Sequence, residues 1–228
     1  EKGGFYRHIY SLPCRWRRAK YHDKVVRVYQ QGFDAPALLN NSEVIVSLTT
    51  FPPRISQLHL VLKSILWQTY VPADIIVWLS EQEFPGRLND LPEELRKLTA
   101  NGVKFKFVPE NFRSHKKYYY VFREYPDHKV ITVDDDLIYP RNTIERLLSL
   151  SYQYPDTVCG NVIRKIRMDG NTFSVYRKWP KVFMMPVNSS LQNVAIGCGG
   201  IYYPSRWYGE ELFDWKIISE HCPFADDL

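Results

Sequence analysis

Three consecutive carboxylates, Asp134, Asp135 and Asp136, directly follow the apolar stretch 130–133. Adjacent carboxylates repel one another, so the triplet is unfavourable unless a cation lies close by. Mg²⁺ and Mn²⁺ take oxygen ligands and commonly bridge carboxylates to substrate phosphates. A solvated acidic turn is the alternative, and it is the commoner explanation for an arbitrary Asp-Asp-Asp. Position favours a cation here, because ligands of open α/β sheets gather at the carboxyl ends of the strands.

Apolar periodicity predicts the strands that would position this triplet. Three stretches are apolar almost throughout, as strands buried on both faces of a sheet are. A fourth, 103–108, alternates apolar and basic residues, which predicts a half-exposed or edge strand. The four predicted strands are residues 44–50, 75–79, 103–108 and 130–133.

Helical patterns separate these strands. Ser56 is a candidate N-cap for the first helix, and Pro92 opens a second helix that ends before Gly102. A third helix is predicted over residues 116–125. Three strand-to-helix units followed by the acidic strand predict an α/β fold with a mostly parallel central sheet flanked by helices.

The pattern changes in the second half of the chain. Asn142 and Glu145 have the spacing of a capping box at the start of a further helix. Beyond it we predict a hairpin turn at residues 168–171, a glycine-rich strand over 195–204 and a helix over 210–219. We therefore expect a single domain over residues 44–228 with a mixed β second half, preceded by an N-terminal arm of residues 1–43.

Positive charge is concentrated in that arm. Residues 1–30 hold eight Lys or Arg and two acidic residues, a net charge of +6, whereas the whole chain of 228 residues carries +5. The remainder is therefore close to neutral. The basic segment could contact an anionic membrane surface, a partner domain or a polyanionic glycan, or could simply be solvated. No nucleic-acid-binding motif accompanies the charge, so no nucleic acid is expected as a partner.

Cysteine usage and hydropathy bear on the compartment. The four cysteines have no metal-binding spacing, which indicates reduced thiols. No apolar run approaches the ~20 residues that span a bilayer. We expect a cytoplasmic protein, with peripheral contact to the inner face of a membrane as an option for the arm. The chain starts at Glu1 without Met, so we also expect a piece of something longer.

Five segments occur in the order typical of one enzyme family. They are residues 44–50 with Arg54, 75–81, 130–136, 197–200 and 225–227. Together they resemble a nucleotide-sugar glycosyltransferase of the GT-A fold, with a DXD motif and similarity to family 2. The resemblance covers residues 44–228 and leaves the arm unexplained. It implies a nucleotide-binding half over 44–140 and an acceptor half over 141–228.

The resemblance implies that the nucleoside is bound at the ends of the first two strands. The residues concerned are Thr49, Thr50, Phe51 and Arg54, with Glu81 as the acidic contact to the base. Hydroxyl and guanidinium groups suit polar base edges and phosphate. A helix-entry turn stiffened by two prolines explains the first four equally well, and Glu81 could be a solvated acid.

The diphosphate is assigned to a lysine at the start of the third helix, Lys117 in preference to Lys116. The helix dipole disfavours a cation at that end. A bound diphosphate that shares the site with the helix N-terminus would explain the lysine. Ordinary surface lysines are the alternative.

Asp134 and Asp136 match the outer positions of DXD. By resemblance, Asp134 contacts the ribose or a metal-bound water, and Asp136 binds Mn²⁺ or Mg²⁺ directly. The metal would neutralise charge on the departing nucleoside diphosphate. Asp135 points the other way on an extended chain and is expected to face the sugar or a backbone amide.

Two further assignments come from the late motifs. Asp227, with Asp226 as the alternative, matches the general base of inverting members, while a helix N-cap pair would look the same. Gly199 and Gly200 match a donor-sugar or acceptor contact, although a packing bulge also explains glycine there.

These assignments predict a metal-dependent, inverting transferase that moves a sugar from a UDP-sugar to a glycan or lipid-linked acceptor in polysaccharide biosynthesis. A sugar nucleotidyltransferase is the second enzyme hypothesis, but it would need a glycine-rich loop after the first strand. A non-catalytic domain that binds carbohydrate or a polyanion is the hypothesis from another class. The sequence does not specify the sugar, the linkage or the acceptor.

Overall fold

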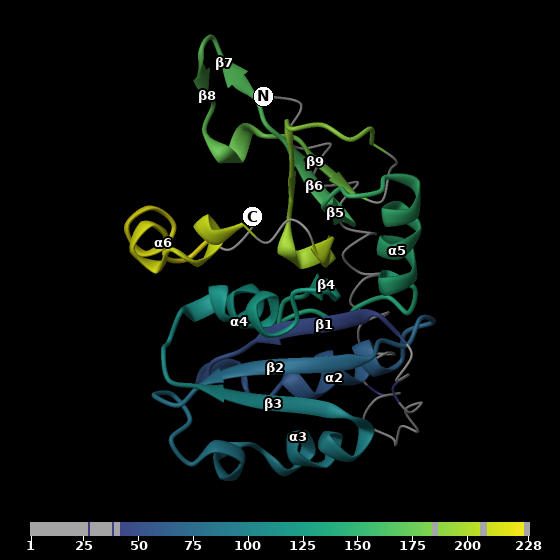
Figure 1. The fold of residues 1–228 in the computed structure, drawn as a ribbon, viewed down its shortest axis with the longest axis vertical. Helices are drawn as coiled ribbons and strands as arrows, with labels where there is room; N and C mark the ends of the chain where they lie inside the picture. Colours follow the sequence, from purple (N-terminus) through teal and green to yellow (C-terminus); the bar gives the residue numbers. More distant parts are fainter. Residues whose placement is uncertain (1–26, 28–37, 39–41, 184–186, 206–208, 226–228) are drawn as a thin grey trace, which may run out of the picture. The chain divides into compact units, whose positions relative to one another are not determined.

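Six strands form the central sheet in the order β3-β2-β1-β4-β11-β5 (Figure 1). In this computed structural model the first four strands along the chain are parallel, and β11 runs antiparallel to both β4 and β5. The strands are β1 (Val44–Thr49), β2 (Asp74–Ser80), β3 (Val103–Val108), β4 (Lys129–Thr132), β5 (Cys159–Gly160) and β11 (Ile201–Tyr203). The predicted mostly parallel α/β sheet is confirmed, and β3 lies at its edge as its alternating sequence indicates.

The structure describes residues 27, 38, 42–183, 187–205 and 209–225. The chain divides into two units, Glu1–Ala35 and Pro36–Leu228, and the elements named above all belong to the second. Apart from Arg27, the first 30 residues lie outside the described part. The predictions for the basic arm, including contact with a membrane or a partner domain, therefore remain predictions.

Helices connect the parallel strands. The connecting helices are α2 (Leu58–Leu66), α3 (Glu93–Lys97) and α4 (Lys116–Glu124), and the described chain continues with α5 (Thr143–Gln153) after β4 and α6 (Trp215–His221) after β11. Since the connections α2 and α3 step along the sheet in one direction and α4 steps back across it, right-handed crossovers place α4 on the opposite face. The first five of the six residues of β1 are buried, which agrees with a sheet covered on both faces. Within the described residues, no helix is long and apolar enough to cross a membrane.

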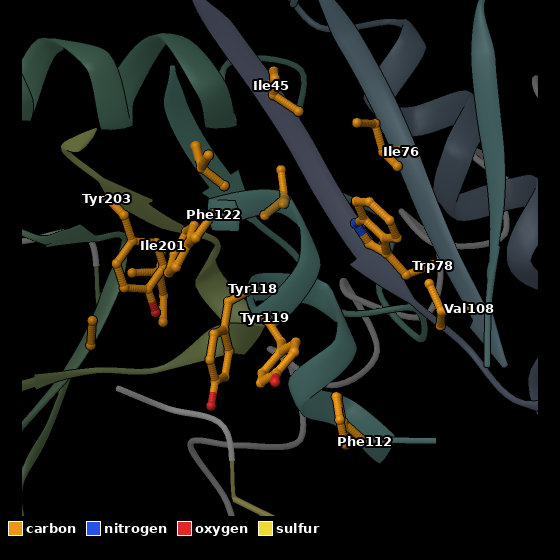
Figure 2. Packing of buried hydrophobic residues seen from close by; sticks show 13 residues of the cluster. Ile45, Ile76, Trp78, Val108, Phe112, Tyr118, Tyr119, Phe122, Ile201 and Tyr203 are labelled. Atoms are coloured by element: carbon orange, nitrogen blue, oxygen red, sulfur yellow. The ribbon is translucent and has the colours of Figure 1, made fainter. Parts of the chain in front are cut away.

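An aromatic core joins α4 to the sheet (Figure 2). Tyr118 and Phe122 of α4 are buried in the same cluster as Trp78 of β2 and Tyr203 of β11. The indole of Trp78 donates a hydrogen bond of 2.9 Å to the hydroxyl of Ser47, which in turn donates to the backbone carbonyl of Lys117. A fully buried tryptophan is thereby satisfied, and the first turn of α4 is fixed against β1.

Two predicted helix starts are wrong. The helix α2 is preceded by Gln57, and Ser56 does not cap it, because residues Pro52–Arg54 form a 3-10 turn that shifts the start of the helix. At α5, Asn142 occupies the N-cap position without a side-chain cap. The Oε2 atom of Glu145 instead accepts a hydrogen bond of 2.7 Å from Thr69, so no capping box forms.

The second half contains two small sheets, built from β10 (Asn193–Ala195), β6 (Val162–Lys165) and β9 (Lys181–Phe183), and from β7 (Met168–Asp169) and β8 (Thr172–Phe173). The predicted hairpin at Gly170 is confirmed. The predicted strand over 195–204 is interrupted by a 3-10 turn, Gly197–Gly199. The predicted helix over 210–219 begins late, at Trp215, where the Asp214 side chain accepts from the Ile217 N–H.

Candidate functional site

The acidic triplet lies where the strand order of the sheet reverses. The neighbours of β1 are β2, the next strand in sequence, and β4, which the chain reaches only after β3. Ser47 pairs with Thr132, and the Val133 N–H donates 3.1 Å to the Ser47 carbonyl. The triplet therefore leaves β4 beside the carboxyl end of β1. Crevices of this kind, at a reversal of strand order, are where open α/β sheets bind ligands.

Asp135 is the structural member of the triplet. Its Oδ1 atom lies 2.7 Å from Arg54 Nη1, and its Oδ2 atom accepts a hydrogen bond of 2.6 Å from Thr50. The side chain is only 7% exposed. A buried carboxylate is stable when a cation and hydrogen-bond donors satisfy it, as here. Its partners are the Thr50 and Arg54 side chains, because residues 135–136 form a turn and strand alternation does not apply. The expected contact of Asp135 with a sugar stays a prediction.

Asp134 and Asp136 are the more accessible carboxylates. Lys117 Nζ lies 2.9 Å from Asp134 Oδ1, and Arg54 Nη1 lies 3.2 Å from Asp136 Oδ2. Asp136 is 48% exposed, the highest value in the triplet. The hydrogen bond to Asp135, followed by the charges of the triplet, raises the pKa of Arg54 and keeps it cationic. Two cations thus face three carboxylates, which leaves one net negative charge at the loop.

The two candidate lysines lie in different surroundings. Lys117 contacts the triplet, as described. Lys116 is also buried, but its Nζ lies 2.8 Å from Asn111 Oδ1 and 3.3 Å from Glu83. Burial lowers the pKa of Lys116, and Glu83 only partly offsets that effect. Of the two, the structure brings only Lys117 to the acidic loop.

The other proposed nucleoside contacts surround Arg54 and the end of β2. Phe51 is partly exposed, and the guanidinium carbon of Arg54 lies 5.4 Å from its ring centroid. The Thr49 hydroxyl donates 2.7 Å to the Trp78 carbonyl, which joins β1 to β2. Glu81 forms an exposed ion pair with Arg87. Phe51 therefore adjoins the acidic loop through Arg54, whereas Thr49 and Glu81 have local partners of their own.

Packing alone requires glycine before β11. A Cβ atom at Gly199 would lie 2.7 Å from the backbone nitrogen of Val162. Gly200 has φ +77°, and a Cβ there would lie 3.3 Å from a methyl group of Leu147. The packing alternative thus accounts for both glycines. Their assignment to a sugar contact remains a prediction.

Asp226 and Asp227 lie outside the described residues, so their assignment as catalytic base stays a prediction. The segment that leads to them is held against the start of α4. His115, fully buried, lies 2.9 Å through Nε2 from the Cys222 carbonyl and 3.0 Å through Nδ1 from the Tyr118 hydroxyl. Arg113 lies 4.2 Å from the ring centroid of Phe224. Residues 222–224 therefore lie beside the helix that carries Lys117.

Sequence reasoning missed the side chains that support the loop after the triplet. The Tyr139 hydroxyl accepts a hydrogen bond of 2.7 Å from the Asp134 N–H, and burial raises the pKa of this phenol well above its usual range. Ser64 accepts from the Tyr139 N–H, and Gln68 donates to the Pro140 carbonyl and accepts from the Ile144 N–H. The available signal was two polar residues on the otherwise apolar buried side of α2 and its C-terminal turn.

The oxygen donors available to a divalent cation at the acidic loop are few. Among the described residues, no group of three or more His, Cys, Asp and Glu side chains could hold a metal ion. Asp134 and Asp136 supply two accessible carboxylates. Mg²⁺ typically takes one or two carboxylates and completes its shell with substrate phosphates and water. The residues therefore fit an ion that binds together with a phosphorylated ligand.

A cavity of about 590 Å³ lies elsewhere, between the end of α5 and strands β6 and β10. Its described lining includes Tyr154, Asn161 and Asn193 and no charged side chain. Within that described lining, none of the residues assigned above to nucleotide, metal or base occurs. The cavity is thus separate from the acidic loop.

No protein-family model and no curated protein sequence matches this chain. Among solved structures, a mannosyltransferase from Pyrobaculum calidifontis, determined in complex with GDP-Man and Mn²⁺, is similar with 15% sequence identity and a TM-score of 0.42. The match covers 62% of this chain and 42% of that chain.

Proposed function

We propose that this protein is a metal-dependent glycosyltransferase of the GT-A type that uses a nucleoside-diphosphate sugar. One observation carries the proposal: three carboxylates and two basic side chains converge on the loop after β4, at the reversal of strand order. A site that bound only neutral sugars would have no use for this charge. A diphosphate with a divalent cation matches it in both signs.

Asp134 and Asp136 would hold Mn²⁺ or Mg²⁺. When bound, the ion supplies electrophilic stabilisation of the diphosphate leaving group. Lys117 lies next to Asp134 and can turn its ammonium group to a phosphate oxygen. Asp135 holds Arg54 in one orientation, with half of the Arg54 side chain exposed for the nucleotide. Phe51 lies beside that guanidinium and is available to stack on the base.

Transfer requires a general base for the acceptor hydroxyl. We assign this role to Asp227, with Asp226 as the alternative, and infer inversion at the anomeric carbon from it. The support is the anchoring of residues 222–224, three to five positions before Asp227 in the sequence, beside α4. The acceptor is proposed to be a glycan or a lipid-linked molecule, and the donor nucleotide to be uridine diphosphate.

The test is metal-dependent nucleotide binding. With Mn²⁺ present, UDP should raise the melting temperature of the protein. Asp136→Asn should lower the affinity for UDP with Mn²⁺ at least about tenfold, since it weakens a direct metal ligand. The control Glu93→Gln changes an exposed carboxylate on α3. GDP is measured in parallel. If neither nucleotide shifts the melting temperature with metal, the proposal is wrong, and a non-catalytic domain becomes the better hypothesis.

A further inference from the structure

The second half of the domain presents a surface that the proposed sugar transfer does not use. Residues 164–181, which we name the basic hairpin, contain β7, β8 and the turn that follows them. In Figure 1 they extend from β6 and β9 away from the central sheet. The segment has six basic residues and one acidic residue, Asp169. Its net charge equals that of the whole chain, +5.

Large apolar side chains are exposed on the same hairpin. Phe173 is 70% exposed and Val175 65%, and Met168 and Tyr176 are also exposed. Isolated exposed apolar residues are ordinary on protein surfaces. Four within nine residues concentrate apolar surface on one hairpin, as at interaction sites. The exposure agrees with the hairpin geometry, since β7 and β8 form a sheet of only two strands in the described part of the chain.

The hairpin is nevertheless held in shape by its own contacts. The Trp179 indole donates 3.0 Å to the Ser174 carbonyl, and the Ser174 N–H donates 2.8 Å to the Arg167 carbonyl. Arg164 donates to the carbonyls of Tyr176 and Trp179, and its guanidinium carbon lies 4.3 Å from the Tyr176 ring centroid. These contacts satisfy the backbone of the turn and hold Phe173 and Val175 outward. The apolar exposure is therefore a built feature of the fold.

From this combination we infer that the basic hairpin binds the surface of an anionic phospholipid membrane. Lys and Arg pair with lipid phosphates, while Phe173, Val175 and Met168 enter the boundary between headgroups and acyl chains. A polyanion in solution would pair with the basic residues, but it would not bury the exposed valine and methionine. A second copy of the chain would bring two strongly positive hairpins together, which charge repulsion opposes.

The experiment is partition of the full chain onto vesicles at about 0.1 M salt, a concentration at which surface charges still act over ~10 Å. Vesicles of phosphatidylcholine with phosphatidylserine are compared with phosphatidylcholine alone. We expect binding to the anionic vesicles only. The apolar variant Phe173→Ser/Val175→Ser and the charge variant Lys165→Glu/Arg177→Glu should each lower the partition coefficient at least about tenfold.

Matched controls separate the hairpin from charge and apolarity in general. Leu88→Ser/Tyr152→Ser removes two exposed apolar groups elsewhere, and Arg96→Glu/Lys97→Glu changes the net charge equally on α3. Both should partition within about twofold of the unmodified chain. The N-terminal arm is present in every variant, so its contribution cancels.

Three outcomes would overturn the inference. One is no binding of the unmodified chain to anionic vesicles, and another is unchanged binding by the apolar variant. The third is binding to dextran sulfate as strong as binding to the anionic vesicles, dependent on the basic residues but not on Phe173 and Val175. That result would show a surface for polyanions. UDP binding of each variant is measured alongside, so failure here is distinguishable from failure of the proposed enzyme activity.

Discussion

The seam where β1, β4 and β11 meet and the basic hairpin use the same residue types in opposite environments. Four residues at the seam are buried and packed against their neighbours: Asp135, Gly199, Gly200 and Tyr139. On the hairpin the corresponding residues are exposed: Asp169, Gly170 and Phe173. The comparison shows that a residue type sets what a side chain can do, whereas its neighbours set how much stability depends on it.

The largest difference is expected between the two aspartates. Asp135→Ala leaves Arg54 and Thr50 without their buried partner, and should lower the free energy of unfolding by about 3 kcal/mol. Asp169→Ala removes an exposed pair with Lys178, and should change it by less than about 0.5 kcal/mol. Urea denaturation measures both. Equal effects would show that Asp135 is not the buried anchor described here.

The next largest loss of stability is expected from substitution of a glycine at the seam. Gly199→Ala places a methyl group against the backbone of Val162, which cannot move without disturbing β6, and should destabilise the protein by about 2 kcal/mol. Gly170→Ala meets no atom within 4 Å and carries only the strain of φ +65°, about 1 kcal/mol. Thermal unfolding compares the two. If Gly170→Ala were the more damaging change, the packing account of Gly199 would fail.

Of the three seam substitutions, the change at the aromatic residue should have the smallest effect on stability. Tyr139→Phe leaves the Asp134 N–H without its acceptor, and should lower stability by about 1–2 kcal/mol. We also expect weaker binding of UDP with Mn²⁺, because Asp134 would lose its fixed backbone. Phe173→Ser should leave both quantities within experimental error. Calorimetric titration of UDP, with unfolding measured on the same samples, distinguishes loss of positioning from simple unfolding.

The parallel sheet was predictable because its strands are continuously apolar and its helices periodic. The apolar stretches within residues 44–49, 74–80 and 129–132 are too short for helices and are typical of buried strands. The helix caps were less predictable. Asn142 and Glu145 have the right spacing for a capping box, but Thr69, from a distant segment, competes for the Glu145 carboxylate. Local sequence does not contain that competitor.

Within the candidate site, the sequence alone determined which residues could carry charge and at which strand end they lie. Only tertiary structure decided their separate environments. Asp135 can be buried because Thr50 and Arg54, in the segment that follows β1, pair with its carboxylate. Lys117 rather than Lys116 contacts the triplet because Ser47 and Trp78 fix the first turn of α4. The sequence gives the order of the charged residues along the chain. Which of them become neighbours depends on strand order and helix rotation, which the whole core fixes together.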